Sequence, residues 1–170
     1  GGEWLSTCTS GFGVRFNGYT GITTAGHCQD TQYWYYNNQL LPFQSGAYSG
    51  SYDIQWHTAP GHTVTNRIFI GPEYRTITAV VPRASQALQS VVCKYGRTTE
   101  YTCGTILSNT YRPSGVPNAT ATYVRMGDPN EVQAQRGDSG GPVFFGQKAY
   151  GSIVGELYVD PYRTDMVYMP

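Results

Sequence analysis

One serine stands between a carboxylate and two glycines in the run Gly137-Asp138-Ser139-Gly140-Gly141-Pro142. Glycine permits tight turns and a close approach of the backbone to a substrate, and it allows backbone N–H groups to converge on one spot. Two convergent N–H groups beside a serine hydroxyl are what an oxyanion hole requires. The run therefore makes Ser139 a candidate nucleophile. The alternative is a glycine-rich surface turn without chemistry.

A second run, Thr24-Ala25-Gly26-His27-Cys28, supplies a candidate base. A serine hydroxyl is a weak nucleophile until a base takes its proton, and imidazole titrates near neutral pH. Asp53 lies among apolar and aromatic neighbours, as expected of a carboxylate that is partly buried on a strand. Such a carboxylate would hold His27 in the right tautomer and stabilise the imidazolium.

The order His27, Asp53, Ser139 with these flanking residues resembles the chymotrypsin-like serine endopeptidases. The short chain looks like their small bacterial secreted branch, the streptogrisin and α-lytic protease group. The resemblance covers nearly the whole chain, and it includes Cys93 to Ile106, a segment similar to a disulfide hairpin of that branch. It implies an acyl-enzyme on Ser139, His27 as general base, Asp53 as its orienting group, and an oxyanion hole made by the backbone N–H groups of Gly137 and Ser139.

The four cysteines permit three pairings, and the resemblance selects Cys8–Cys28 and Cys93–Cys103. Disulfides indicate an oxidising compartment, so we expect a secreted, extracellular protein. The first bridge would fix the backbone beside His27. The chain begins at Gly1-Gly2-Glu3 without a signal peptide, and we interpret it as a processed form. The resemblance also allows for a pro-segment during folding.

The composition limits the kinds of binding partner that we expect. Lys+Arg and Asp+Glu are both 11, the formal net charge is zero and 13% of the residues are charged, which gives no reason to expect a nucleic-acid or membrane partner. No Cys-x-x-Cys spacing occurs, so we expect no zinc site, no other metal and no cofactor. His57 and His62 are interpreted as residues of a solvated loop. The expected partner is a protein or peptide substrate, and the expected state is a monomer.

Short strands and hairpin turns run along the chain, and 15 tyrosines, 21 glycines and 10 prolines favour an all-β protein. Asn17-Gly18 between Gly13–Phe16 and Tyr19–Thr23 is a hairpin signal. Further strands are expected at 32–36, 52–56, 67–70, 76–80, 91–93, 101–107, 120–126, 142–145, 149–154 and 166–169, with a linker at 81–90.

Two antiparallel Greek-key β-barrels are the natural interpretation of this pattern, and the resemblance implies the same architecture. We expect an N-terminal barrel over residues 1–82, carrying His27 and Asp53. We expect a C-terminal barrel over residues 83–170, carrying Ser139, the oxyanion hole and the specificity pocket. The active site would lie in the cleft between the barrels.

The resemblance also assigns supporting residues. Asp138 needs a cationic partner if it is buried; the bacterial branch uses an arginine at the position of Lys94, so Lys94 is the first candidate and Arg97 the second. The substrate strand would pair with Val154-Gly155-Glu156. Gln133 and Ala134 map to the pocket floor, Arg136 to its rim and Met166 to its back wall.

Three positions depart from the pattern of the family. Val154 replaces a serine that supports the aspartate, Glu156 replaces a glycine at the pocket, and Gln135 replaces a cysteine. Glu156 could narrow or charge the pocket, attract a basic side chain, or pair with Arg136. Because fold does not guarantee activity, the alternative to a serine endopeptidase is a catalytically weak or inactive binding module on a protease fold.

Overall fold

The Asn17-Gly18 turn forms where the sequence predicts it. In the computed structural model, which describes residues 1–170, Asn17 and Gly18 have φ angles of 48° and 82°. Positive φ at both central positions is the signature of the type I′ turn, whose twist matches that of a hairpin. It joins β1 (Gly13–Phe16) to β2 (Tyr19–Thr24) in antiparallel register. The end of β2 delivers the chain to His27.

The N-terminal half is built on a four-stranded sheet in the order β1-β2-β6-β5, with β5 at Phe43–Ser49 and β6 at Tyr52–Thr58. Two short ladders complete it: β3 (Gln32–Tyr33) with β4 (Leu40–Leu41), and β7 (Arg67–Phe69) with β8 (Tyr74–Thr76). The buried core of this half is made by Leu5, Ile22, Leu41 and Ala59.

The C-terminal half is a closed barrel. Six antiparallel strands follow the order β13-β10-β11-β12-β15-β14, and pairing of β13 with β14 closes the ring. Their bounds are β10 Val91–Gly96, β11 Glu100–Tyr111, β12 Tyr123–Gly127, β13 Pro142–Phe145, β14 Lys148–Asp160 and β15 Arg163–Met169. Closure leaves no unpaired sheet edge in this ring. Its interior is filled by Val92, Ile106, Val124, Met126, Ala134, Val143, Ile153, Met166 and Tyr168.

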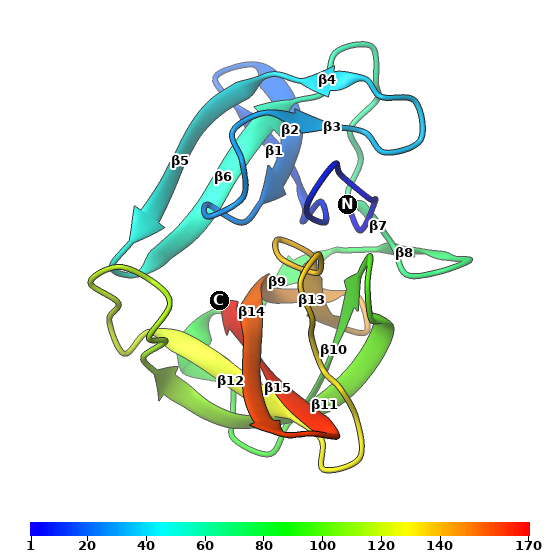
Figure 1. Cartoon of the computed structure of the whole chain (residues 1–170). Coiled ribbons are helices and arrows are strands. Elements are labelled where there is room, and N and C mark those ends of the chain that lie inside the picture. Colours follow the sequence, from blue (N-terminus) through cyan, green and yellow to red (C-terminus); the bar gives the residue numbers. More distant parts are fainter.

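The two halves lie one above the other, with β1 to β6 in the upper part of Figure 1 and β10 to β15 in the lower part. The predicted all-β fold is confirmed. A boundary at residue 82 stays a prediction. Just before it, β9 (Ala79–Val80) pairs in parallel with β14 of the C-terminal half.

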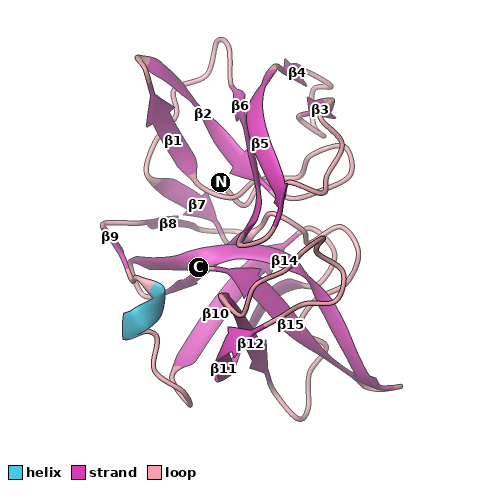
Figure 2. Ribbon diagram, turned by 90° about the vertical axis from the view of Figure 1, so that its left-hand side faces the viewer, coloured by secondary structure: helices cyan, strands magenta, loops and turns pink.

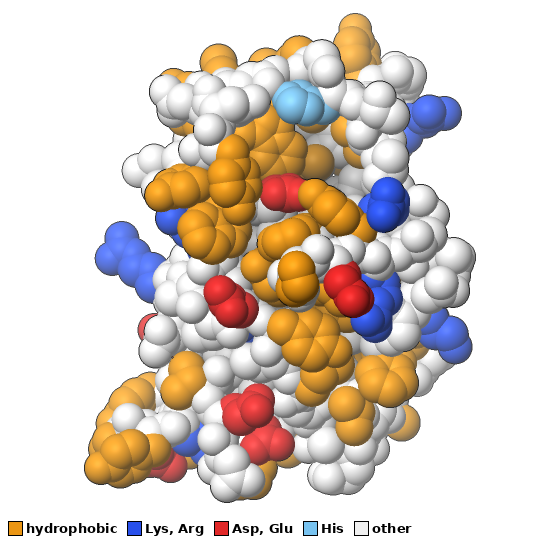
Figure 3. Space-filling model, turned by 90° about the vertical axis from the view of Figure 1, so that its right-hand side faces the viewer, with side chains coloured by type: hydrophobic (Ala, Val, Ile, Leu, Met, Phe, Trp, Pro, Cys, Tyr) orange, Lys and Arg blue, Asp and Glu red, His pale blue; other side chains and the backbone are white.

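The linker at 81–90 contains the one helix of the structure, a single 3₁₀ turn at Arg83–Ser85, which is drawn in cyan in Figure 2. The structure has no helix with the length and apolar character needed to cross a membrane. It has no group of three or more His, Cys, Asp or Glu side chains placed to hold a metal ion. On the face shown in Figure 3, hydrophobic side chains are interspersed with basic and acidic ones.

Three expectations about the elements were wrong. No strand was expected at β5, but Phe43–Ser49 pairs with β6 although all seven of its residues are exposed. The strand expected at 76–80 is divided between β8 and β9, which pair with different partners. His57 is not in a solvated loop: it is fully buried on β6, where its Nδ1 lies 2.8 Å from the carbonyl oxygen of Leu41.

Candidate active site

His27, Asp53 and Ser139 are brought together across the cleft between the halves. His27 Nε2 lies 2.9 Å from Ser139 Oγ, and His27 Nδ1 lies 2.8 Å from Asp53 Oδ2. The tautomer that satisfies both contacts carries its proton on Nδ1, so that Nδ1–H donates to Asp53 and Nε2 accepts the hydroxyl proton of Ser139. This is the arrangement in which a histidine can take a proton from a serine.

Local structure fixes each of these side chains. His27 follows β2, and the Cys8–Cys28 disulfide ties the next residue to the N-terminal segment. Asp53 is the second residue of β6 and is fully buried. Its Oδ1 accepts the backbone N–H of His27 at 2.9 Å, so both oxygens of the carboxylate bond the same residue. No other donor reaches the carboxylate of Asp53.

The loop before Ser139 leaves two N–H groups free. Neither Gly137 nor Ser139 donates its backbone N–H to an acceptor within the chain. Gly137 has a φ of 107°, a conformation that favours glycine, and an added Cβ would collide with the Thr98 hydroxyl. Two unpaired donors beside the hydroxyl of Ser139 are the arrangement predicted for an oxyanion hole.

Asp138 and Lys94 form a buried ion pair under this loop. Both side chains are fully buried, and Lys94 Nζ lies 3.8 Å from Asp138 Oδ2. Burial lowers the pKa of Lys94 from 10.5 to about 8, against the opposing effect of the Asp138 charge. Lys94 also donates to the Thr99 hydroxyl and, at 2.8 Å, to the Glu100 carbonyl oxygen.

Four further donors reach the carboxylate of Asp138. They are the N–H groups of Thr98, Thr99 and Gln135 at 2.8, 3.1 and 3.0 Å, and the Thr99 hydroxyl. These bonds join the hairpin between β10 and β11 to the loop that carries Ser139. The Cys93–Cys103 disulfide closes the base of the same hairpin.

Arg97, the second candidate partner of Asp138, has another role. Its Nη1 donates to the carbonyl oxygens of Leu5 and Ser6 at 2.5 and 3.1 Å, and its guanidinium carbon lies 5.6 Å from the Trp4 ring centroid. Arg97 therefore joins the hairpin of the C-terminal half to the first segment of the N-terminal half.

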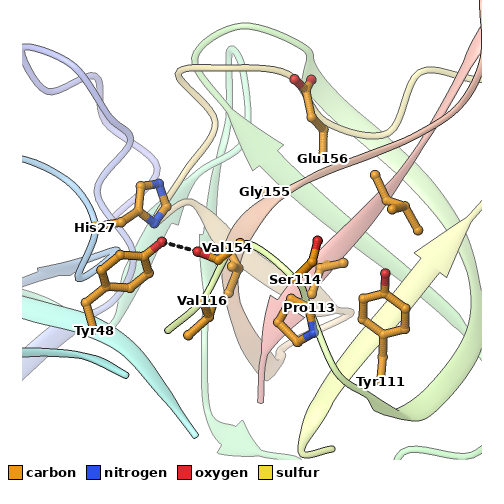
Figure 4. Close-up of a pocket in the computed structure, with 12 residues that line it drawn as sticks. His27, Tyr48, Tyr111, Pro113, Ser114, Val116, Val154, Gly155 and Glu156 are labelled. Atoms are coloured by element: carbon orange, nitrogen blue, oxygen red, sulfur yellow. Dashed lines mark hydrogen bonds between the residues drawn. The ribbon is translucent and has the colours of Figure 1, made fainter. Parts of the chain in front are cut away.

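A cavity of about 180 Å³ lies beside His27. Tyr48 of β5 forms one wall, with its ring centroid 5.6 Å from that of His27. The loop after β11 forms the opposite wall, and the Tyr48 hydroxyl donates to the Gly115 carbonyl oxygen of that loop at 2.5 Å (dashed line in Figure 4). The floor comes from β14. The complete lining is His27, Tyr48, Tyr111, Pro113, Ser114, Gly115, Val116, Val154, Gly155, Glu156, Leu157 and Val167.

The residues predicted for substrate binding divide into two groups. Val154, Gly155 and Glu156 line this cavity, and Glu156 is exposed, with its carboxylate pointing away from Tyr111 and Val116 in Figure 4. Arg136 is exposed and forms no ion pair, so the suggested pairing with Glu156 does not occur.

The remaining three, Gln133, Ala134 and Met166, do not line an open pocket in this structure, because none has exposed surface. Ala134 and Met166 pack inside the C-terminal barrel. The side chain of Gln133 is held by β11: its Oε1 accepts from the Thr102 hydroxyl at 3.1 Å, and its amide donates to the Cys103 carbonyl oxygen at 3.1 Å.

Sequence reasoning missed Thr9, a residue that contacts the Ser139 loop from the other half. Its N–H donates to the Ser139 carbonyl oxygen at 2.9 Å, and its hydroxyl donates to the Gly137 carbonyl oxygen at 2.8 Å. Nothing in the sequence around Thr9 signals this position, since it lies 128 residues from Gly137.

Comparison with known proteins finds bacterial proteases that are similar in sequence or in fold. The chain is 32% identical over 155 residues to streptogrisin-C of Streptomyces griseus, a match that covers 87% of this chain and 32% of the relative. The chain thus spans about a third of the length of this curated relative. No family model matches the sequence.

Solved structures are similar over the full chain. Thermobifida fusca protease A superimposes with a TM-score of 0.77 at 27% identity, covering 100% of this chain and 90% of that one. A glutamic-acid-specific serine protease, with a TM-score of 0.83 at 20% identity and coverage of 100% and 92%, shares the fold. By sequence over most of its own length and by fold, this chain is similar to bacterial proteases.

Proposed function

We propose that this chain is a secreted serine endopeptidase that hydrolyses peptide bonds through an acyl-enzyme on Ser139. The observation that carries the proposal is the continuous contact from Asp53 through His27 to Ser139, at 2.8 and 2.9 Å, beside two unpaired backbone N–H groups. Catalysis by a serine requires this contact between base and nucleophile, whereas binding a ligand does not.

The proposed reaction proceeds in two halves. Ser139 Oγ attacks the carbonyl carbon while its proton moves to His27 Nε2, and the buried carboxylate of Asp53 stabilises the resulting imidazolium. The N–H groups of Gly137 and Ser139 stabilise the oxyanion. Collapse of the tetrahedral intermediate transfers the proton from Nε2 to the leaving amine. Water then repeats the sequence on the acyl-enzyme and releases the carboxylate product and free Ser139.

Substrate binding is proposed along β14. Val154 lies next to the nucleophile, since its carbonyl oxygen is 3.5 Å from Ser139 Oγ, and Gly155 and Glu156 continue from it along the cavity. An extended peptide laid along this segment would place its scissile carbonyl at Ser139. The two disulfides support secretion, because they persist in oxidising compartments. A pro-segment and a monomeric state stay predictions.

Labelling by a fluorophosphonate tests the proposal, because that probe reacts with an activated serine. We expect stoichiometric labelling of the wild-type protein on Ser139 and cleavage of a denatured protein substrate. Ser139→Ala should lose both, with residual catalysis no greater than the roughly 10³ to 10⁴ over water that binding and an oxyanion hole provide alone. Absence of labelling in a folded wild-type protein would favour the binding module.

A further inference from the structure

The two donors of the proposed oxyanion hole are held in different ways. The Ser139 N–H belongs to the peptide whose carbonyl is that of Asp138, and that carbonyl oxygen accepts the Gly141 N–H at 2.9 Å. The loop's own backbone therefore fixes this peptide. The Gly137 N–H belongs to the peptide whose carbonyl is that of Arg136, and no backbone N–H reaches that oxygen.

A side chain, rather than a backbone N–H, donates to the Arg136 carbonyl oxygen. The hydroxyl of Thr98, in the hairpin between β10 and β11, donates to the Arg136 carbonyl oxygen at 2.8 Å. In a planar trans peptide the N–H and C=O point in opposite directions, so holding the carbonyl also aims the N–H. We propose that Thr98 is a positioning residue that keeps the Gly137 N–H directed into the oxyanion hole.

The location of this peptide explains why it needs support. Arg136 is exposed, Gly137 is only partly buried, and glycine can rotate about its backbone at little steric cost. If the peptide between them turned over, the carbonyl oxygen would face the position of the oxyanion in place of the N–H. The fold would remain intact, but one of the two donors would be lost.

Thr98 is well placed for this task because its backbone is anchored separately. Its N–H donates to Asp138 Oδ1 at 2.8 Å, a bond that any residue at this position can make. The hydroxyl can therefore be removed without disturbing the contact between the hairpin and Asp138. On the other side of the loop, the Thr9 hydroxyl holds the Gly137 carbonyl oxygen, so the peptides on both sides of Gly137 are fixed by threonine side chains.

This inference rests on the proposed endopeptidase function and is tested with the intact chain. Thr98→Val removes the hydroxyl and keeps the shape, and Thr98→Ser keeps the hydroxyl. Complete loss of one oxyanion donor lowers kcat by about 10² to 10³. Because the valine variant only releases the donor, we expect kcat to fall about tenfold with KM within twofold of wild type, and we expect Thr98→Ser to restore it.

A peptidyl trifluoromethyl ketone gives a second measurement, since attack by Ser139 Oγ turns its carbonyl oxygen into an oxyanion. Its affinity should fall in Thr98→Val by the same factor as kcat, whereas the affinity of the matching product peptide should not change. Thr31→Val is the control, because Thr31 is exposed and its hydroxyl makes no hydrogen bond.

The outcomes separate the two proposals. If wild type is labelled and cleaves substrate but Thr98→Val has kcat and ketone affinity within twofold of it, the role of Thr98 is wrong and the endopeptidase stands. An equal loss in Thr98→Ser would also reject the hydroxyl as the cause. If thermal unfolding shows that the valine variant is less stable, the ratio of ketone affinity to product affinity still tests the role of Thr98, because both affinities are measured on the folded fraction. A wild-type protein that is neither labelled nor active refutes the proposed function itself.

Discussion

Both carboxylate oxygens of Asp53 accept hydrogen bonds from one residue, His27. The effect of replacing Asp53 with asparagine can therefore be predicted. An asparagine at this position has one oxygen, which can accept from only one of the two N–H groups of His27. Its NH₂ group would face the other one. If the oxygen accepts the backbone N–H, the amide faces Nδ1, which must then become an acceptor. The proton moves to Nε2, and His27 can no longer accept the proton of Ser139.

We therefore predict that Asp53→Asn lowers kcat by about 10⁴ while the fold is retained. Steady-state kinetics at neutral pH measures the loss, and circular dichroism checks the fold. Asp30→Asn is a suitable control, since Asp30 is an exposed acid near His27 in sequence. A tenfold loss or less in Asp53→Asn would mean that Asp53 does not set the tautomer.

For single residues, the sequence identifies those whose chemical type defines their role. It misses those whose role depends on where the fold places them. His27, Asp53 and Ser139 are recognisable because a base, an acid and a nucleophile occur in motifs with a known order. Thr9 is invisible because threonine is common and the partner carbonyls belong to a distant segment. The side chains of Ala134 and Met166, which are predicted to line the pocket, are buried inside the C-terminal barrel, and alignment gives their position but not how far neighbouring side chains fill the space around them.

Among the elements, β6 carries a buried histidine that makes the native state sensitive to acid. Burial lowers the pKa of His57 below its ordinary value of 6.5, and its Nε2 is buried without a hydrogen-bond partner. As the pH falls through 6.5 toward the lowered native pKa, the unfolded chain binds a proton that the native chain does not. The free energy of unfolding therefore decreases over this window.

We predict that His57→Gln gives a shallower loss of unfolding free energy than wild type as the pH falls below about 6.5. Glutamine retains a donor for the Leu41 carbonyl oxygen, so the variant should still fold. The exposed His62 provides the control as His62→Gln. Urea unfolding at several pH values measures the slopes, and identical slopes for wild type and His57→Gln would show that His57 does not contribute.

The hairpin between β10 and β11 depends on the buried pair of Lys94 and Asp138. Removing one partner of such a pair leaves an uncompensated charge in the interior, at a cost of about 3 to 5 kcal/mol. We expect Lys94→Met to lower the free energy of unfolding by this amount, with Lys148→Met, at an exposed position, as the control. A loss below about 1 kcal/mol would indicate that the four hydrogen bonds to Asp138 suffice without the cation.

Elements were predictable where the pattern of residue types is local. The Asn17-Gly18 turn specifies its own hairpin, and the strands of the C-terminal barrel carry enough apolar residues to be recognised. In contrast, β5 has no buried residue, so it is a strand only because β6 offers an edge to pair with. The strand propensity of its own residues cannot reveal a strand that forms because a neighbouring strand is available for pairing.

Across the whole molecule, the cleft is spanned by contacts from both halves. The loop after β11 lies against the turn between β5 and β6: the Ser51 hydroxyl is 2.7 Å from that of Thr120, and the Gly50 N–H donates to the Pro117 carbonyl oxygen at 2.8 Å (Figure 1). The bond from Tyr48 to Gly115 joins the same two segments, and both of its residues line the cavity beside His27.

We predict that Tyr48→Phe, which removes only the hydroxyl, changes selectivity more than overall activity. One neutral hydrogen bond contributes about 0.5 to 1.5 kcal/mol, enough to loosen the wall formed by Gly115 without unfolding the protein. Peptides that differ only in the residue before the scissile position should be discriminated less sharply, as measured by ratios of kcat/KM. Tyr162→Phe, at a highly exposed tyrosine, is the control, and unchanged ratios in Tyr48→Phe would contradict the role of this bond.

The closed C-terminal barrel and the N-terminal sheet, whose outer strands are β1 and β5, differ in how they open. A closed ring has no end strand to detach, whereas β5 pairs with a neighbouring strand along one side only and has no buried side chain. When β5 detaches, it becomes an extended segment of the kind that an endopeptidase cleaves. For an active enzyme, we expect autolysis to begin within Phe43–Ser49. Because one molecule cleaves another, the intact chain should be lost faster as the protein concentration rises. The Ser139→Ala variant should remain uncleaved under the same conditions.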